Sequence, residues 1–179
     1  MITRLLEVFF IFLPAFVGNA LPVVAKNIPG IRRFSRPISP TWLGRNKTYR
    51  GLIAGVLGGM LCGIILTALV HSGFLLQWVR FDSFYRDFWN GIFFGFLLSF
   101  GALIGDMIKS FAKRRVGKKP GAMFQPWDGI DYILATIIVM LPFIFLSWVE
   151  IIFLLLIGPL LSLTCNTIAY SIGWKDCWY

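Results

Sequence analysis

The chain has 179 residues, of which 58% are hydrophobic, with a formal net charge of +9 at pH 7 and a mean hydropathy of +0.77. A soluble domain of this length could not bury so much apolar surface, so the composition excludes a soluble globular protein. Apolar runs of about 20 residues match a bilayer-crossing helix, and the alternating pattern of a membrane β-barrel is absent. We therefore expect a single domain over residues 1–179, folded as an all-α, polytopic membrane helical bundle.

Apolar stretches along the chain predict about five transmembrane helices. They cover residues 5–25, 51–70, 91–111, 132–148 and 151–172. Prolines fall inside three of these stretches and are expected to kink the helices toward protein or water, since lipid offers no partner for a freed carbonyl. The first stretch carries Asn19 between Pro14 and Pro22, which suits a bent helix that lines a polar cavity.

Basic residues concentrate in two connections, about residues 26–50 and 112–130. Because cytoplasmic loops are enriched in Lys and Arg, both connections are expected in the cytoplasm, with the N-terminus outside and the C-terminus cytoplasmic. Attraction to anionic lipid headgroups is the alternative explanation for most of these cations. The connection around residues 72–90 is rich in aromatic residues and is expected at the outer interface of the cell membrane.

Glycines recur every fourth position in the second and third predicted spans. This spacing lets helix backbones approach closely, so these residues are expected to form packing ridges, and a homodimer is possible. The glycines are Gly51, Gly55, Gly59, Gly63, Gly101 and Gly105.

Three of the eight acidic residues converge on the most basic region: Asp106 near the end of the third span, and Asp128 and Asp131 at the start of the fourth. An unpartnered acid in an apolar helix costs about 2.5–3.5 kcal/mol at the bilayer centre, so a functional role is the default interpretation. Asp128 and Asp131 are three residues apart and would share one face of a helix that begins there. Carboxylates without neighbouring His or Cys favour Mg²⁺, which makes these three acids the predicted catalytic and metal-binding residues. Simple ion pairing with nearby cations is the alternative.

The segment GRNKTYRG, residues 44–51, places a small turn, a hydroxyl and three cations before the second span. It looks like a shortened Walker A motif, but it lacks the spacing of the first glycine and a preceding strand, so a P-loop is not expected. Its side chains could still contact phosphate near a helix N-terminus, whose dipole favours anions. Together with cations after the third span, they give the predicted phosphate-binding set: Lys47, Thr48, Arg50, Lys113, Arg114, Lys118 and Lys119.

Five blocks of the sequence resemble the CDP-archaeol synthases, a family related to the phosphatidate cytidylyltransferases. The blocks are PAFVGNALPV at 14–23, GRNKTYRG at 44–51, GDMIKSFAKRRVGKKPG at 105–121, QPWDGID at 125–131 and NTIAYSIGWKD at 166–176. The third and fourth blocks are also similar to the cytidylyltransferase signature, with an acid, a Lys-Arg pair, a glycine-basic turn, a proline and a closing DxxD. Ser162 stands where the family pattern would have a histidine, so no role is assigned to it.

The resemblance implies transfer of CMP from CTP to an unsaturated archaeal ether-lipid phosphate, 2,3-bis-O-geranylgeranylglycerol 1-phosphate, with release of pyrophosphate. Such a Mg²⁺-dependent nucleotidyltransferase would have CTP, an isoprenoid ether-lipid phosphate and membrane lipids as partners, and no nucleic acid. Asn19 and Asn166 are assigned to polar positioning of substrate, with hydrogen bonding between helices as the alternative.

Two other functions agree less well with the same residues. A CDP-alcohol phosphotransferase needs a downstream Ala-Arg and a second DxxxD, which the sequence after Asp128 and Gly129 does not supply. A small membrane transporter or anion-binding membrane protein would be expected to show internal repeats and polar groups through both leaflets. The predicted polar residues instead gather on one side.

Overall fold

The computed structural model describes residues 1–28, 35–73, 84–118 and 128–175. Within these residues there are five helices: α1 (Ile2–Lys26), α2 (Tyr49–His71), α3 (Phe88–Arg115), α4 (Asp131–Met140) and α5 (Trp148–Ser171). Four of them, α1, α2, α3 and α5, are long and apolar enough to cross a membrane. The expected all-α architecture of a multi-pass membrane protein is therefore confirmed.

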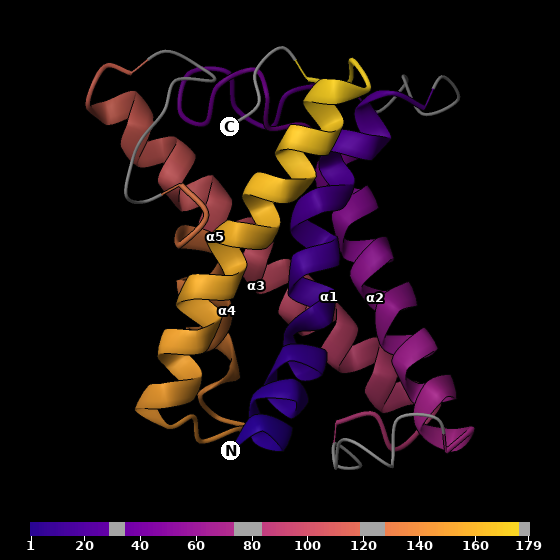
Figure 1. The fold of residues 1–179 in the computed structure, drawn as a ribbon. Coiled ribbons are helices and arrows are strands. Elements are labelled where there is room, and N and C mark those ends of the chain that lie inside the picture. The colour runs from indigo at the N-terminus through magenta and orange to yellow at the C-terminus, as the bar shows by residue number, and fades with distance from the viewer. Residues whose placement is uncertain (29–34, 74–83, 119–127, 176–179) are drawn as a thin grey trace.

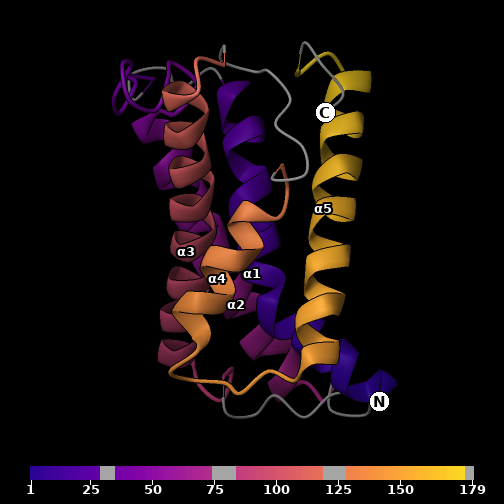
Figure 2. The same cartoon turned by 90° about the vertical axis from the view of Figure 1, so that its left-hand side faces the viewer.

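The bundle is built around α1, which packs against α2 and α3 and also contacts α5. The short α4 lies against α3 (Figures 1 and 2). The described part of the connection before α2 and the end of α3 lie at the same end of the bundle, where α5 finishes, whereas α1 begins at the opposite end (Figure 1). This arrangement is compatible with the predicted orientation, and the side of the membrane on which each end lies stays a prediction.

The fourth helix is shorter than the predicted span of residues 132–148. It covers Asp131–Met140, about 15 Å at 1.5 Å per residue, which is roughly half the thickness of the hydrocarbon layer. Pro142 ends the helix, because proline has no N–H for the carbonyl one turn earlier and its ring clashes with that carbonyl. The chain then turns to Ser147, which forms a capping box with Glu150 at the start of α5. The predicted bounds of this span are therefore wrong.

Glycines on α2 pack against the backbones of α1 and α3. A Cβ atom at Gly55 would meet the carbonyl oxygen of Gly18 at 2.6 Å, and one at Gly59 would meet the carbonyl oxygen of Gly95 at 2.8 Å. The predicted close packing of this ridge is confirmed. Because helices of the same chain already fill it, the α2 ridge is not available for a second copy of the protein.

The end of the bundle where α1 begins is held by polar contacts. Arg4 Nε donates a hydrogen bond of 2.6 Å to Glu150 of α5, and its Nη1 donates one of 3.0 Å to Glu7. Tyr85, in the connection between α2 and α3, is fully buried and donates a hydrogen bond of 2.8 Å to the carbonyl of Ile11. Burial raises the pKa of the Tyr85 phenol well above its ordinary value, so the hydroxyl remains a donor. These contacts fix the position of α1 between its neighbours.

Candidate active site

The candidate site is organised around the ammonium group of Lys109 on α3. Its Nζ lies 3.2 Å from Asp106 Oδ1, 3.4 Å from Asp128 Oδ1 and 3.1 Å from Asp131 Oδ2. The side chains of Lys109 and Asp131 are only 13% and 8% exposed, so water screens their attraction poorly. The three acids selected from the sequence therefore come together in the fold, where they surround Lys109.

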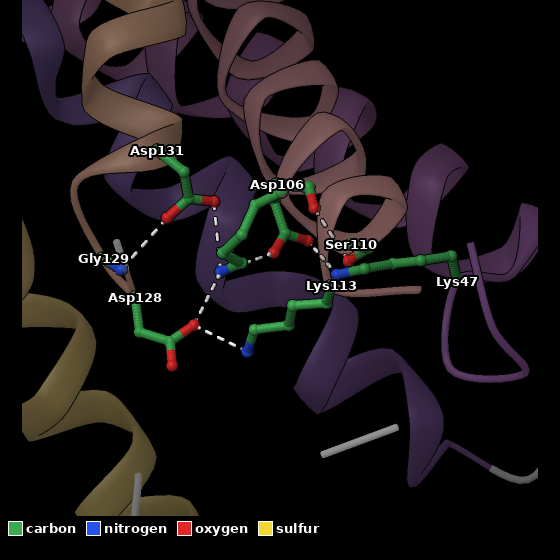
Figure 3. Close-up of polar contacts among 8 residues, drawn as sticks. Lys47, Asp106, Ser110, Lys113, Asp128, Gly129 and Asp131 are labelled. Atoms are coloured by element: carbon green, nitrogen blue, oxygen red, sulfur yellow. Dashed lines mark hydrogen bonds and ion pairs between the residues drawn. The ribbon is translucent and has the colours of Figure 1, made fainter. Parts of the chain in front are cut away.

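Two more lysines reach the same carboxylates from other directions (Figure 3). Lys47, which precedes α2, pairs with Asp106 Oδ2. Lys113, one turn beyond Lys109 on α3, donates a hydrogen bond of 2.8 Å to Asp128 Oδ1. Segments that are distant in the sequence thus supply three negative and three positive charges to one partly buried cluster.

Two glycines hold Asp131 in place at the start of α4. Asp131 Oδ1 accepts a hydrogen bond of 3.0 Å from the backbone N–H of Gly129. Gly129 has a φ of +92°, a conformation that side chains other than glycine rarely adopt, and a Cβ there would meet Pro159 Cα at 2.9 Å. On the other side, a Cβ at Gly105 would lie 2.5 Å from the carbonyl oxygen of Asp131. The turn that carries two of the acids is therefore clamped between α3 and α5.

Tyr132 fixes the first turn of α4 against α5. Its side chain is buried, and its hydroxyl donates a hydrogen bond of 2.7 Å to the carbonyl of Gly158. Its ring also lies edge-on to Phe16 of α1, with the ring centroids 6.3 Å apart. The first turn of α4, which carries Asp131, is thus packed against α5 and α1, in addition to its contact with α3 at Gly105.

Two predicted phosphate-binding residues at the start of α2 have different surroundings. Thr48 caps the helix, since its Oγ1 accepts a hydrogen bond of 3.2 Å from the backbone N–H of Gly51. Arg50 is buried, and within the described part of the chain its Nε has no hydrogen-bond partner. A buried guanidinium nitrogen without a partner is costly, so Arg50 is suited to bind an anion. A cavity of about 50 Å³ adjoins Lys47, Thr48 and Asp106.

The remaining predicted cations lie at the end of α3. Arg114 Nη1 donates a hydrogen bond to the carbonyl of Lys118, whose side chain is exposed. Lys119 lies outside the described residues. A second cavity, of about 250 Å³, is lined by Thr41, Trp42, Arg114 and Arg115.

The two asparagines assigned to positioning are not joined to the acidic cluster. Asn19 on α1 and Asn166 on α5 are each partly buried. Among the hydrogen bonds of the described residues, none involves either side chain, whether to the cluster or between helices. Ser162 is also partly buried on α5.

The site residues predicted from the sequence do not include Lys109. Its signal in the sequence is local, because it stands three residues after Asp106 and four before Lys113, which places the three side chains on one face of α3. Its contacts with Asp128 and Asp131 depend on how α4 packs against α3. Only the fold shows that one ammonium group meets all three acids.

The chemistry of this donor set fits Mg²⁺, since three carboxylates supply the hard oxygen ligands that the ion prefers. Within the described residues, no three His, Cys, Asp or Glu side chains are grouped so as to hold an ion as they stand. The space among Asp106, Asp128 and Asp131 is taken by Lys109 Nζ. A metal held by these acids would therefore have to replace that ammonium group.

Comparison with known proteins finds relatives over nearly the whole chain. A family model described as CarS-like, CDP-archaeol synthase, matches residues 1–179. The CDP-archaeol synthase of Thermococcus kodakarensis is 36% identical over 173 residues, covering 94% of this chain and 92% of that protein. The enzyme of the same name from Methanosarcina mazei is 35% identical over 178 residues, covering 91% and 97%. A solved structure of an intramembrane enzyme for archaeal membrane lipid biosynthesis is 28% identical, with a TM-score of 0.69, and the match covers 90% of this chain and 94% of that one.

Proposed function

The chain belongs to the CDP-archaeol synthase family, and on that basis we propose that it transfers CMP from CTP to an archaeal ether-lipid phosphate and releases pyrophosphate. The acceptor that we propose is 2,3-bis-O-geranylgeranylglycerol 1-phosphate, used at the cytoplasmic face of the membrane. The observation that carries the proposal is the cluster of three acids and three lysines in a membrane-embedded bundle.

The reaction needs charge neutralisation more than it needs a base. A phosphate oxygen of the lipid attacks the α-phosphorus of CTP, a new oxygen–phosphorus bond forms, and the bond to the bridging oxygen of the departing pyrophosphate breaks. The attacking oxygen is already anionic, so no strong general base is required. Catalysis then depends on holding two anionic groups in line, which is the work of positioning and electrostatic stabilisation.

Cations on either side of the acids support this proposed role. Lys47 comes from the segment before α2 and Lys113 from α3, so they reach the carboxylates from separate elements. Arg50 is buried, and its Nε has no partner among the described residues, so it adds a donor that a phosphate oxygen would satisfy. We propose that these residues, together with Thr48, Arg114, Lys118 and Lys119, bind the phosphates of the two substrates, and that Asn19 and Asn166 orient them.

Mg²⁺ would be held by Asp106, Asp128 and Asp131. When bound, it would supply neutralisation of the triphosphate charge and polarisation of the phosphoryl oxygens. The close contacts at Gly105 and Gly129 hold Asp106 of α3 and Asp131 of α4 near each other.

The proposal is tested by incubating the purified protein with CTP labelled at the α-phosphate, Mg²⁺ and a panel of lipid phosphates. The panel contains the unsaturated geranylgeranyl ether lipid, its saturated counterpart and a diacyl phosphatidic acid. We expect label in the lipid fraction, matched by pyrophosphate release, and the greatest transfer to the unsaturated ether lipid. ATP, GTP and UTP in place of CTP serve as controls. Transfer no greater than in a lipid-free reaction, for every acceptor, would reject the proposal.

A further inference from the structure

A lysine occupies the place where the proposed metal would bind. Resting on the proposed function, we infer that Lys109 is an internal counter-ion, which holds the three carboxylates in the empty enzyme and is displaced when the metal and CTP bind together. Lys109 is thereby a positioning residue that links metal binding to nucleotide binding.

The contacts of Lys109 set it apart from its neighbours. Its Nζ lies within 3.4 Å of an oxygen of Asp106, Asp128 and Asp131. Lys47 is paired with Asp106 and Lys113 with Asp128, so each of these lysines is paired with one of the three acids. A divalent cation bound by all three carboxylates would compete for them mainly with the Lys109 ammonium group.

The charge balance of the cluster explains why the metal needs the nucleotide. Three carboxylates and three ammonium groups sum to zero. A divalent ion added alone would leave two excess positive charges in a partly buried site, where such an excess is poorly screened. A triphosphate that arrives with the metal offsets this excess and offers anionic oxygens to the released ammonium group.

The side chain of lysine suits an exchange of partners. Its ammonium is a compact charge on a flexible four-carbon stem, so it can leave one set of oxygens and reach another without movement of the backbone. Arginine at the same position would bind carboxylates in a bidentate manner and would leave them less readily. The competing possibility is a permanent structural ion pair, in which Lys109 stays on the acids throughout.

Metal binding without nucleotide separates these possibilities. We would titrate the nucleotide-free protein with Mn²⁺, a paramagnetic substitute for Mg²⁺, and follow the free ion by electron paramagnetic resonance. Lys109→Met should bind Mn²⁺ at least about tenfold more tightly than the wild type, which is about 1.4 kcal/mol. Lys109→Arg, which keeps the charge and the ion pairs, should bind it more weakly than the wild type.

Lys113→Met and Lys47→Met are the matched controls, since each removes one positive charge from the same cluster. They should change Mn²⁺ affinity by less than about threefold, because each lysine is paired with one acid of the set. Saturating CTP should then raise Mn²⁺ affinity more in the wild type than in Lys109→Met. Size-exclusion chromatography and thermal unfolding in detergent check that each variant is folded.

The outcomes distinguish this inference from the proposed function. The inference that Lys109 is displaced would be overturned if Lys109→Arg left the Mn²⁺ affinity unchanged and Lys109→Met did not raise it. This holds even if the enzyme transfers CMP. If Lys109→Met does not fold, the Lys109→Arg titration decides alone. An equal gain in all three methionine variants would also overturn it, since general charge removal would then explain the effect. Absence of CMP transfer by the wild type would reject the proposed function, whatever the titrations give.

Discussion

Gly105 of α3 lies against the backbone of Asp131 of α4, so closely that a Cβ atom on the glycine would stand 2.5 Å from the Asp131 carbonyl oxygen. The two helices therefore touch through their main chains at the level of the acidic cluster. Asp106 is the next residue on α3, so this one contact brings two of the three carboxylates together.

Gly105→Ala should separate the carboxylates. The added methyl group would also meet Ala135 Cβ at 2.6 Å and Tyr132 Cα at 2.9 Å, and backbone atoms cannot yield as a flexible side chain does. Such overpacking costs about 1–3 kcal/mol. We expect the rate of CMP transfer to fall at least about tenfold, which is equivalent to about 1.4 kcal/mol and lies within that range.

Gly101→Ala, one turn earlier on the same face of α3, is the control. A Cβ there would have its nearest neighbours at 3.3 Å and 3.4 Å, so small adjustments accommodate it. Transfer rates and unfolding temperatures of both variants, measured in the same detergent, provide the comparison. Equal losses in the two variants would show that the Gly105 contact has no special part in the site.

Neutralising the acids should abolish transfer without unfolding the protein. Asp131→Asn and Asp106→Asn keep the size of the side chain but remove the charge that the metal and Lys109 require. We expect a loss of about a hundredfold or more, partly recovered at high Mg²⁺ if only metal affinity has fallen. Asp87→Asn is the matched control, because Asp87 Oδ1 caps α3 by accepting a 2.9 Å hydrogen bond from the backbone N–H of Asn90, and asparagine caps equally well. Near-normal transfer by Asp131→Asn at limiting Mg²⁺ would contradict the metal assignment.

Lys47→Met should weaken the use of CTP. The ammonium group of Lys47 pairs with Asp106 in the site, whereas Lys26, the last residue of α1, is exposed at the same end of the bundle. Removal of a phosphate-binding charge should raise the KM for CTP about tenfold, the effect of about 1.4 kcal/mol. Lys26→Met should leave it within about twofold. Similar small effects in both variants would favour the interpretation of these cations as topology signals and lipid-headgroup contacts.

Hydropathy was sufficient to locate most of the fold. Four apolar runs correspond to α1, α2, α3 and α5, because the thickness of a bilayer imposes their length. The same reasoning failed for α4, since the apolar run continues past Pro142 and only the backbone chemistry of proline ends the helix. Apolar composition reports which residues lie in the membrane, but it does not report where a helix stops.

The site could be predicted in part. Asp106 was detectable as an acid in apolar surroundings, and Asp128 and Asp131 by their spacing. The central place of Lys109 was not detectable, because it requires α3 and α4 to meet at Gly105, and a local pattern does not specify such a contact. The Asn19 side chain on α1 makes no hydrogen bond within the described residues, so its role in orienting substrate stays a prediction.

The orientation of the bundle can be tested with single cysteines in a background that lacks Cys62, Cys165 and Cys177. Ser35→Cys and Lys118→Cys should react with a membrane-impermeant maleimide from the cytoplasmic side. Ser72→Cys, just after α2, should react from the outside. Labelling in sealed membrane vesicles of known orientation gives the result. Reaction of all three from one side would contradict the proposed topology.

The shortness of α4 has a consequence for the biogenesis of the protein. A ten-residue helix is too short to be integrated into a bilayer as an independent span. It is held instead by its neighbours: by α3, where Gly105 lies against the Asp131 carbonyl oxygen, and by α5, through the hydrogen bond from Tyr132 to Gly158 and the contact of Gly129 with Pro159. A nascent chain that ends before α5 would carry all three acids of the cluster but would lack one of the two helices that hold Asp131 in place.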